Sequence, residues 1–255
     1  MIQLTHVCKQ YGRQAVVDDL SLEVDAGEVL ILLGGSGCGK TTTLKMINRL
    51  VEPTSGAVSI DGTDTSTIPP HELRRRIGYA FQQVGLFPHL TVAENVAVTP
   101  SLLGWAPARI RTRTEELLEL VELEPDKVRD RRPNELSGGQ QQRVGVARAL
   151  AASPDVLLLD EPFGALDPLT RERLQESFLH VRRELGLTAV FVTHDMAEAL
   201  LLGDRVAVMH DGRLEQIGAP RDLLNRPGSP YVRELMDTPR RQAAAVSRLS
   251  SEPTA

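Results

Sequence analysis

A glycine-rich stretch, Gly34 to Thr41, combines residue types and spacing that suit phosphate chemistry. It satisfies the pattern G-x-x-x-x-G-K-[ST], which wraps nucleotide phosphates. Its glycines lack the Cβ atoms that would stop the backbone curling around a phosphate chain, and they leave N–H groups pointing inward. The motif predicts that Lys40 reaches the β- and γ-phosphates and that the Thr41 hydroxyl binds Mg²⁺; the alternative is a glycine-rich turn beside a surface lysine. The predicted phosphate-binding residues are Gly34, Gly35, Ser36, Gly37, Cys38, Gly39, Lys40, Thr41 and Thr42.

Two adjacent carboxylates, Asp160 and Glu161, follow the apolar run Val156 to Leu159. They would repel each other and resist desolvation unless a cation compensates, and Mg²⁺ would do so. Because neighbouring side chains on a strand point to opposite sides, we expect Asp160 to face the metal and Glu161 to face the attacking water. The alternative is a pair of surface acids at a strand exit.

Ser137, Gly138, Gly139 and Gln140 precede an alanine-rich helical stretch. Ser137 and Gln140 fit a capping box, which is the purely structural interpretation. A capped helix does not explain the two glycines, each of which costs up to about 1 kcal/mol relative to alanine in a first helical turn. They are explained if a phosphate approaches the helix N-terminus, and that phosphate could belong to a nucleotide held by another subunit.

The pattern of apolar residues predicts the elements that position these groups. Val29 to Leu33 is suited to a buried strand, and Lys40 to Leu50 to a helix with Leu44, Ile47 and Leu50 on one face. The phosphates would therefore lie at a helix N-terminus, where the dipole favours negative charge. His194 follows the predicted strand Thr188 to Thr193, at the edge where open α/β sheets bind ligands, so we expect it to contact phosphate.

Further segments complete a mixed α/β pattern. Alternation predicts antiparallel strands at Ile2 to Val7 and Val16 to Val24. Tyr11 between them is either an ordinary hairpin aromatic or a ring that stacks on a base. From Thr91 to Leu123 helical periodicity takes over, with a capping box at Thr91 and a stripe of Leu117, Leu118 and Val121. The other predicted elements are strands at Ala57 to Ile60 and Gly78 to Phe81, helices from Pro70 to Arg75 and from Pro168 to Leu185, and a hairpin from Arg205 to Ile217.

Composition limits the class of protein. The 255 residues are 41% hydrophobic, enough for a core, and no apolar run approaches the length needed to span a bilayer. Two distant cysteines, Cys8 and Cys38, argue against a zinc site or a disulfide framework and favour a reducing compartment, the cytosol. The N-terminus lacks a signal-peptide pattern. The net charge of −5 gives no broad attraction to nucleic acid, and the local arginine clusters fit a solvated helix surface better than a nucleic-acid face.

Together these segments resemble the ATP-binding subunit of an ABC transporter, from Ile2 to about Asp237. Gly34 to Thr41 is similar to its Walker A loop, Leu136 to Gln140 to its LSGGQ signature, and Val156 to Asp160 to Walker B, with Glu161 as the following acid. The remaining matches are Gln82 at the Q-loop, Ala165-Leu166-Asp167 at the D-loop, His194 at the switch histidine and Tyr11 at the adenine-stacking A-loop.

The resemblance implies an α/β fold: a P-loop NTPase (RecA-like) core with an antiparallel β subdomain and an inserted α-helical subdomain. The nucleotide-binding domain would span 1–238. Its core would lie at about 1–87 and 154–238 and its helical subdomain at about 88–153. The tail 239–255 is expected to be disordered. Many relatives carry C-terminal regulatory modules, for which this tail would leave no room.

The resemblance also implies cofactors and partners. Two copies would form a head-to-tail dimer that sandwiches two ATP molecules, each held by one copy's P-loop and the other's Ser137, Gly138, Gly139 and Gln140, with Asp167 from the D-loop. Glu161 would polarise the attacking water, and Gln82 would join Thr41 and Asp160 around Mg²⁺. Permease subunits would bind near the Q-loop and the helical subdomain, at the cytoplasmic face of the inner membrane. An extracytoplasmic solute-binding protein would act indirectly, and no nucleic acid is expected.

More narrowly, the chain looks like importers of quaternary amines, the glycine betaine, carnitine and choline type. The residues behind this are Gly37 to Leu50, Glu52 to Gly56, Gln82 to His89 and Phe191 to Glu198. Gly35 departs from the pattern, because relatives usually have proline there. Glycine should loosen the loop by about 0.4–1 kcal/mol. The alternatives are import of another small solute such as an amino acid, a soluble ABC-type ATPase acting on DNA or ribosomes, and a nucleotide-binding module that does not hydrolyse.

Overall fold

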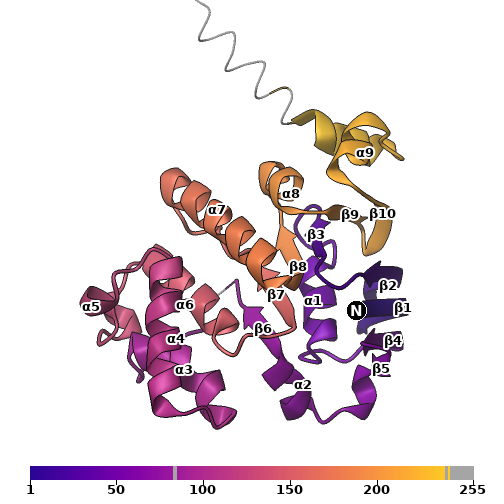
Figure 1. Ribbon diagram of the computed structural model, residues 1–255. Coiled ribbons are helices and arrows are strands. Elements are labelled where there is room, and N and C mark those ends of the chain that lie inside the picture. Colours follow the sequence, from indigo (N-terminus) through magenta and orange to yellow (C-terminus); the bar gives the residue numbers. More distant parts are fainter. Residues whose placement is uncertain (83–84, 239–240, 242–255) are drawn as a thin grey trace, which may run out of the picture.

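The structure is a computed structural model, and it describes residues 1–82, 85–238 and 241. Within these residues the strands form two sheets, one of six strands in the order β10-β9-β3-β8-β7-β6 and one of four in the order β2-β1-β4-β5 (Figure 1). The predicted tail, except residue 241, lies outside the described residues, as do Gln83 and Val84 of the stretch Gln82 to His89. The strands are β1 (Ile2–Tyr11), β2 (Gln14–Val24), β3 (Val29–Leu33), β4 (Ser55–Ile60), β5 (Thr63–Asp64), β6 (Ile77–Ala80), β7 (Val156–Asp160), β8 (Thr188–Thr193), β9 (Arg205–His210) and β10 (Arg213–Gly218).

Helices lie between and beside the sheets. They are α1 (Lys40–Ile47), α2 (Pro70–Arg76), α3 (Val92–Leu102), α4 (Pro107–Leu120), α5 (Pro125–Val128), α6 (Gly138–Leu150), α7 (Pro168–Leu185), α8 (Met196–Leu202) and α9 (Pro220–Asn225). Residues 230–238 are also helical. In the described part of the chain no helix has the length and apolar character that crossing a membrane requires.

The larger sheet determines where the functional residues lie. Strands β6, β7, β8, β3 and β9 run parallel, and β10 is antiparallel to β9. The carboxyl ends of the parallel strands therefore share one edge, which is where open α/β sheets place their ligands. The segments that follow β3, β6, β7 and β8 all leave the sheet at this edge.

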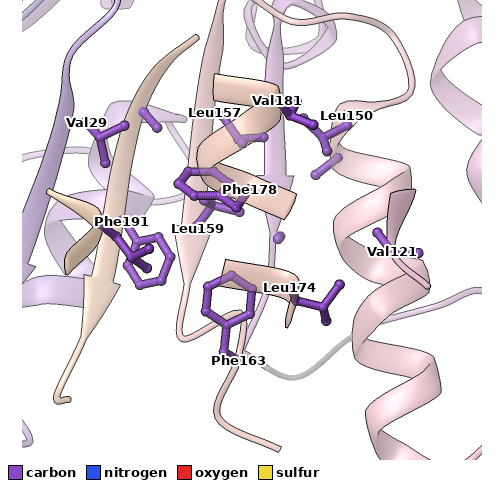
Figure 2. Packing of buried hydrophobic residues seen from close by; sticks show 14 of the residues in the cluster. Val29, Val121, Leu150, Leu157, Leu159, Phe163, Leu174, Phe178, Val181 and Phe191 are labelled. Atoms are coloured by element: carbon purple, nitrogen blue, oxygen red, sulfur yellow. The ribbon is translucent and has the colours of Figure 1, made fainter. Parts of the chain in front are cut away.

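Both faces of the larger sheet are covered, which explains why its central strands are continuously apolar. Leu30 and Leu32 of β3 pack with α1 and the smaller sheet, whereas the alternate residues of β3 pack with the cluster on the opposite face. Figure 2 shows that opposite cluster, in which the rings of Phe163, Phe178 and Phe191 meet beside β7. The predicted buried strands are confirmed.

The helices α3 to α6 gather at one side of the molecule (Figure 1). The predicted capping box is present at the start of α3, between Thr91 and Glu94. Leu117, Leu118 and Val121 are buried, as their periodicity predicted. They belong to the same apolar cluster as the α7 face of the sheet, so the helical region is packed onto the core.

One predicted helix is shorter than expected. Helix α1 ends at Ile47, and Arg49 adopts a left-handed backbone with φ 49°. The amides of Leu50 and Val51 both donate to the carbonyl oxygen of Lys45, which closes the helix end. Leu44 and Ile47 are buried as predicted, but the placement of Leu50 on the same face was wrong, because the chain has turned and its side chain is 40% exposed.

Candidate active site

The P-loop, Gly34 to Thr41, joins β3 to α1 and is pressed between neighbouring strands. A Cβ on Gly34 would lie 2.2 Å from the carbonyl oxygen of Met209 in β9. Gly39, the N-cap of α1 with φ 100°, would place a Cβ 2.6 Å from the carbonyl oxygen of Val16 in β2. Real Cβ atoms do not approach backbone oxygens so closely. Glycine at these two positions therefore lets the loop fit against β9 and β2.

Lys40 is held inside the loop that carries it. Its side chain is 6% exposed, and its ammonium group donates to the carbonyl oxygens of Gly34 at 2.8 Å and Gly35 at 2.7 Å. The Cys38 sulfur lies 3.6 Å from the same nitrogen. The loop thus fixes a positive charge at the N-terminus of α1, where two favourable contributions to anion binding meet.

Asp160 ends β7 and contacts the P-loop directly. The Thr41 hydroxyl donates to Asp160 Oδ1 at 2.9 Å, and the carboxylate is 3% exposed. Burial raises the pKa of Asp160, while the Thr41 hydrogen bond and the charge of Lys45 act in the opposite direction. A buried carboxylate beside a hydroxyl is a donor set that suits Mg²⁺, which prefers a few protein oxygens and fills its octahedron with water and phosphate oxygens. Among the described residues, no group of three or more His, Cys, Asp and Glu side chains could hold a metal ion.

Glu161 lies between two polar side chains from neighbouring strand ends. Gln82 Nε2 donates to Glu161 Oε2 at 3.1 Å, and His194 Nδ1 lies 3.1 Å from Oε1. Glu161 has a left-handed backbone with φ 48°, so the strand alternation from which its orientation was argued ends at Asp160. The Glu161 carboxylate lies at the cleft because the chain turns there.

A cleft of about 510 Å³ brings the predicted groups together. It contains P-loop residues and the three polar residues that follow β6, β7 and β8. The lining residues are Val16, Ser36, Gly37, Gly39, Lys40, Thr41, Thr42, Gln82, Glu161 and His194. The ammonium group of Lys40 and the carboxylate of Glu161 therefore border the same cavity. This arrangement is suited to positioning a phosphate chain and a water molecule.

Other predicted site residues lie outside this cleft lining. Tyr11 is 51% exposed at the end of β1, with the Lys9 ammonium 5.1 Å from its ring centre. Asp167 caps α7 by accepting from the Thr170 amide, a hydrogen bond that lowers the pKa of its carboxyl. The predicted roles of Tyr11 and Asp167 remain predictions.

Ser137 and Gln140 form the predicted capping box at the start of α6. The position of a Cβ on Gly138 is open space, while a Cβ on Gly139 would lie 3.2 Å from the Leu166 side chain. These residues are also outside the cleft lining. The N-terminus of α6 therefore has a small, accessible surface at Gly138, and its function as a phosphate contact remains a prediction.

Gln142 is a buried polar residue at the site that sequence reasoning missed. Its side chain is 4% exposed and bridges two backbone groups: Nε2 donates to the Glu161 carbonyl oxygen at 2.8 Å, and Oε1 accepts from the Ala165 amide at 2.9 Å. It thus connects α6 to the turn that carries Glu161. No signal in the sequence separates it from Gln140 and Gln141 beside it.

Comparison with known proteins identifies close similarity. The ABC transporter family model matches residues 17–164. The carnitine transport ATP-binding protein OpuCA of Listeria monocytogenes is 50% identical over 237 residues, covering 92% of this chain and 59% of the relative, so the chain spans about three fifths of that protein. The glycine betaine uptake system ATP-binding protein YehX of Escherichia coli is 53% identical over 234 residues, 92% of this chain and 76% of the relative. The dimeric structure of the ATP-binding cassette MJ0796 bound to ADP and Pi matches with a TM-score of 0.81 and 38% identity, covering 87% of this chain and 99% of that one.

Proposed function

The chain belongs to the ABC transporter family and is an ABC-type ATPase cassette, and on this premise we propose that it couples ATP hydrolysis to the uptake of a quaternary ammonium compound or related osmoprotectant. The main support for ATP hydrolysis is that Lys40, Thr41, Glu161 and His194 line the same cleft. The solute class is supported by the named functions of OpuCA and YehX, whose sequences are about half identical to this one.

The positions of the side chains support the following catalytic roles. Lys40 and the P-loop amides bind the phosphates of ATP, and Thr41 and Asp160, with Gln82, would hold Mg²⁺. When bound, the metal ion would neutralise charge on the β- and γ-phosphate oxygens. Glu161 orients the attacking water and accepts its proton, while His194 both contacts the γ-phosphate and fixes the Glu161 carboxylate. Phosphoryl transfer needs this positioning and charge stabilisation more than covalent help.

We infer that two copies combine head to tail to complete two ATP sites. Ser137, Gly138, Gly139 and Gln140 of one copy would cover the ATP held by the P-loop of the other. The open space at Gly138, its position outside the cleft of its own chain, and the dimeric MJ0796 structure support this arrangement. Asp167 and Tyr11 would complete the nucleotide's surroundings.

A groove of about 470 Å³ between α2, β6 and the helical region is the surface we propose for the permease subunits. Leu50, Phe81 and Phe87 line it and are each about 40% exposed. Fully buried Asn95 holds the backbone of Phe87, since its Oδ1 accepts from the Phe87 amide and its Nδ2 donates to the Phe87 carbonyl oxygen. The groove therefore offers a stable apolar surface beside Gln82. A cassette docked there would lie at the cytoplasmic face of the membrane, with a solute-binding protein acting on the opposite side.

A transport assay tests the proposal. The chain and its permease subunits are placed in membrane vesicles, and uptake of glycine betaine, carnitine and choline is compared with uptake of a neutral amino acid. ATP-dependent uptake of a quaternary amine, lost in Lys40→Ala, is the expected result. Uptake of the amino acid alone would show that the proposed solute class is wrong. ATP hydrolysis that no permease stimulates would contradict the coupling of hydrolysis to transport.

A further inference from the structure

In the helical segment 230–238, the side chain of Tyr231 contacts the P-loop. The Gly35 amide donates to the Tyr231 hydroxyl oxygen at 3.2 Å, across 196 positions of sequence. A Cβ on Gly35 would lie 3.7 Å from the same oxygen, an ordinary contact. The phenol and the loop backbone are therefore in hydrogen-bond contact without crowding.

The ring of Tyr231 is fixed on the side away from the loop. It stacks on His210, the last residue of β9, with ring centres 3.9 Å apart and an angle of 24° between the planes. The ring also packs against the main apolar cluster. Burial raises the pKa of the phenol, so the hydroxyl keeps its proton at neutral pH. Tyr231 thus presents a neutral acceptor at a defined position.

Gly35 links this acceptor to the P-loop lysine. Its amide donates to Tyr231, and its carbonyl oxygen accepts from the Lys40 ammonium at 2.7 Å. The other lysine contact is the Gly34 carbonyl oxygen at 2.8 Å, which belongs to the same planar peptide group as the Gly35 amide. Gly35 is exposed and carries no side chain that could hold it in place. The orientation of the Gly34–Gly35 peptide determines where the Gly34 carbonyl oxygen lies, and this oxygen is one of the two that hold the ammonium group.

We propose that Tyr231 is a positioning residue for the ATP site. Its hydroxyl holds the Gly34–Gly35 peptide so that Lys40 is placed to bind phosphate. The inference rests on the proposed use of the P-loop for ATP. The phenol acts from outside the loop and does not touch the nucleotide. Losing its hydroxyl should weaken ATP binding more than it slows the chemical step.

Variants of both partners separate the hydrogen bond from ring packing. Tyr231→Phe removes the acceptor and keeps the stacked ring. Gly35→Ala keeps the donor, whereas Gly35→Pro removes it and puts a ring carbon where the amide hydrogen pointed, so that the Tyr231 hydroxyl becomes an obstacle. Tyr231→Phe is therefore made in the wild-type, Gly35→Ala and Gly35→Pro chains, and KM and kcat for ATP are measured for each.

We expect Tyr231→Phe to raise KM for ATP about two- to fivefold in the wild-type and Gly35→Ala chains, the range of a single partly exposed neutral hydrogen bond. The change in kcat should stay within about twofold. In the Gly35→Pro chain the same substitution should leave KM unchanged or lower it. An equal rise in KM in all three chains would show that the Tyr231 hydroxyl acts by a route other than the Gly35 amide, and no rise in the wild-type chain would also overturn the proposal.

A second measurement does not depend on nucleotide. Hydrogen–deuterium exchange of the peptide covering the P-loop is followed in the ATP-free protein, and thermal melting confirms that each variant is folded. Exchange at the Gly35 amide should be faster in Tyr231→Phe than in the wild-type chain. If the Gly35 amide exchanges faster in Tyr231→Phe but the wild-type chain binds no ATP, the hydrogen bond is supported and the proposed function is refuted. If exchange at this amide is the same in both chains, the hydrogen bond itself is refuted.

Discussion

Asp160 is charged and buried, and this combination costs stability in the absence of a cation. Because its pKa is raised in the folded chain, the folded state binds more protons than the unfolded state between the ordinary and the raised pKa. Stability therefore falls as pH rises through that window. The carboxylate that suits Mg²⁺ therefore destabilises the folded state of the protein when no cation is bound.

Replacing Asp160 by asparagine should stabilise the nucleotide-free protein. The amide oxygen still accepts from Thr41, and the buried charge is gone. We expect Asp160→Asn to raise Tm at pH 7.5, by about 2–4 °C for each kcal/mol gained in the free energy of unfolding. The gain should disappear near pH 3, where Asp160 is protonated. Asp155→Asn, at an exposed carboxylate just before β7, is the control. A lower Tm for Asp160→Asn than for the wild type would contradict this account.

Glu161 should matter for the chemical step and little for binding. Glu161→Gln keeps the size of the side chain and its contact with Gln82, but it cannot accept a proton from water. We expect kcat for ATP hydrolysis to fall by about 10²–10⁴ while KM changes little. Exposed Glu172→Gln on α7 serves as the comparison. A kcat for Glu161→Gln within a few-fold of the wild type would remove Glu161 from the proposed mechanism.

Gly35 illustrates where a residue-scale prediction was incomplete. From the sequence alone, glycine instead of proline predicted a loop loosened by about 0.4–1 kcal/mol. The structure adds a hydrogen bond from the Gly35 amide to Tyr231, and a net neutral hydrogen bond contributes about 0.5–1.5 kcal/mol. The two effects are of similar size and opposite sign. The contact was not predictable because no local pattern connects positions so far apart in the chain.

At the scale of elements, the turn after β7 depends on α6. Gln142 fixes the backbone on both sides of the segment from Glu161 to Ala165, and Glu161 adopts its left-handed backbone within that turn. The helix whose N-terminus carries Ser137 and Gly138 is therefore connected by hydrogen bonds to the turn that carries the Glu161 carboxylate. A shift of α6 would be transmitted to Glu161 through one side chain.

Removing the Gln142 bridge should slow catalysis through Glu161. Gln142→Met fills the same volume without hydrogen bonds, and we expect kcat to fall about tenfold with a smaller change in KM. The effect should be absent in the Glu161→Gln background, because residues that act as a unit are not additive. An equal loss of kcat in both backgrounds would show that Gln142 acts by another route.

Elements with a strong local signal were predictable, and long-range contacts were not. The strands at β3, β7 and β8 and the capping boxes at Thr91 and Ser137 follow from hydrophobic pattern and cap chemistry, and the structure confirms them. Motif spacing located Lys40, Thr41 and Asp160, which the parallel sheet brings together. The end of α1, the turn at Glu161 and the Gln142 bridge depend on tertiary packing, so no local pattern of residues indicated them.

At the scale of the whole molecule, the cleft proposed to bind phosphate and the N-terminus of α6 involve different residues of one chain. Apart from Val16 of β2, the cleft residues lie in segments that follow β-strands of the larger sheet, whereas Gly138 belongs to the helical region at the side of the molecule (Figure 1). In the proposed shared site, a second copy would bring its Gly138 to the phosphate bound by the first. ATP would then hold two copies together, and hydrolysis would release them.

The mass of the Glu161→Gln protein with and without Mg-ATP, measured by gel filtration with light scattering, tests this account most directly. We predict the 27.9 kDa chain without nucleotide and a dimer of about 56 kDa, twice that mass, with Mg-ATP. Adding Gly138→Asp should abolish the dimer, because a carboxylate at that open position would repel the partner's phosphate. A species that stays at the mass of one chain with Mg-ATP, or a dimer that Gly138→Asp leaves intact, would contradict the shared ATP site.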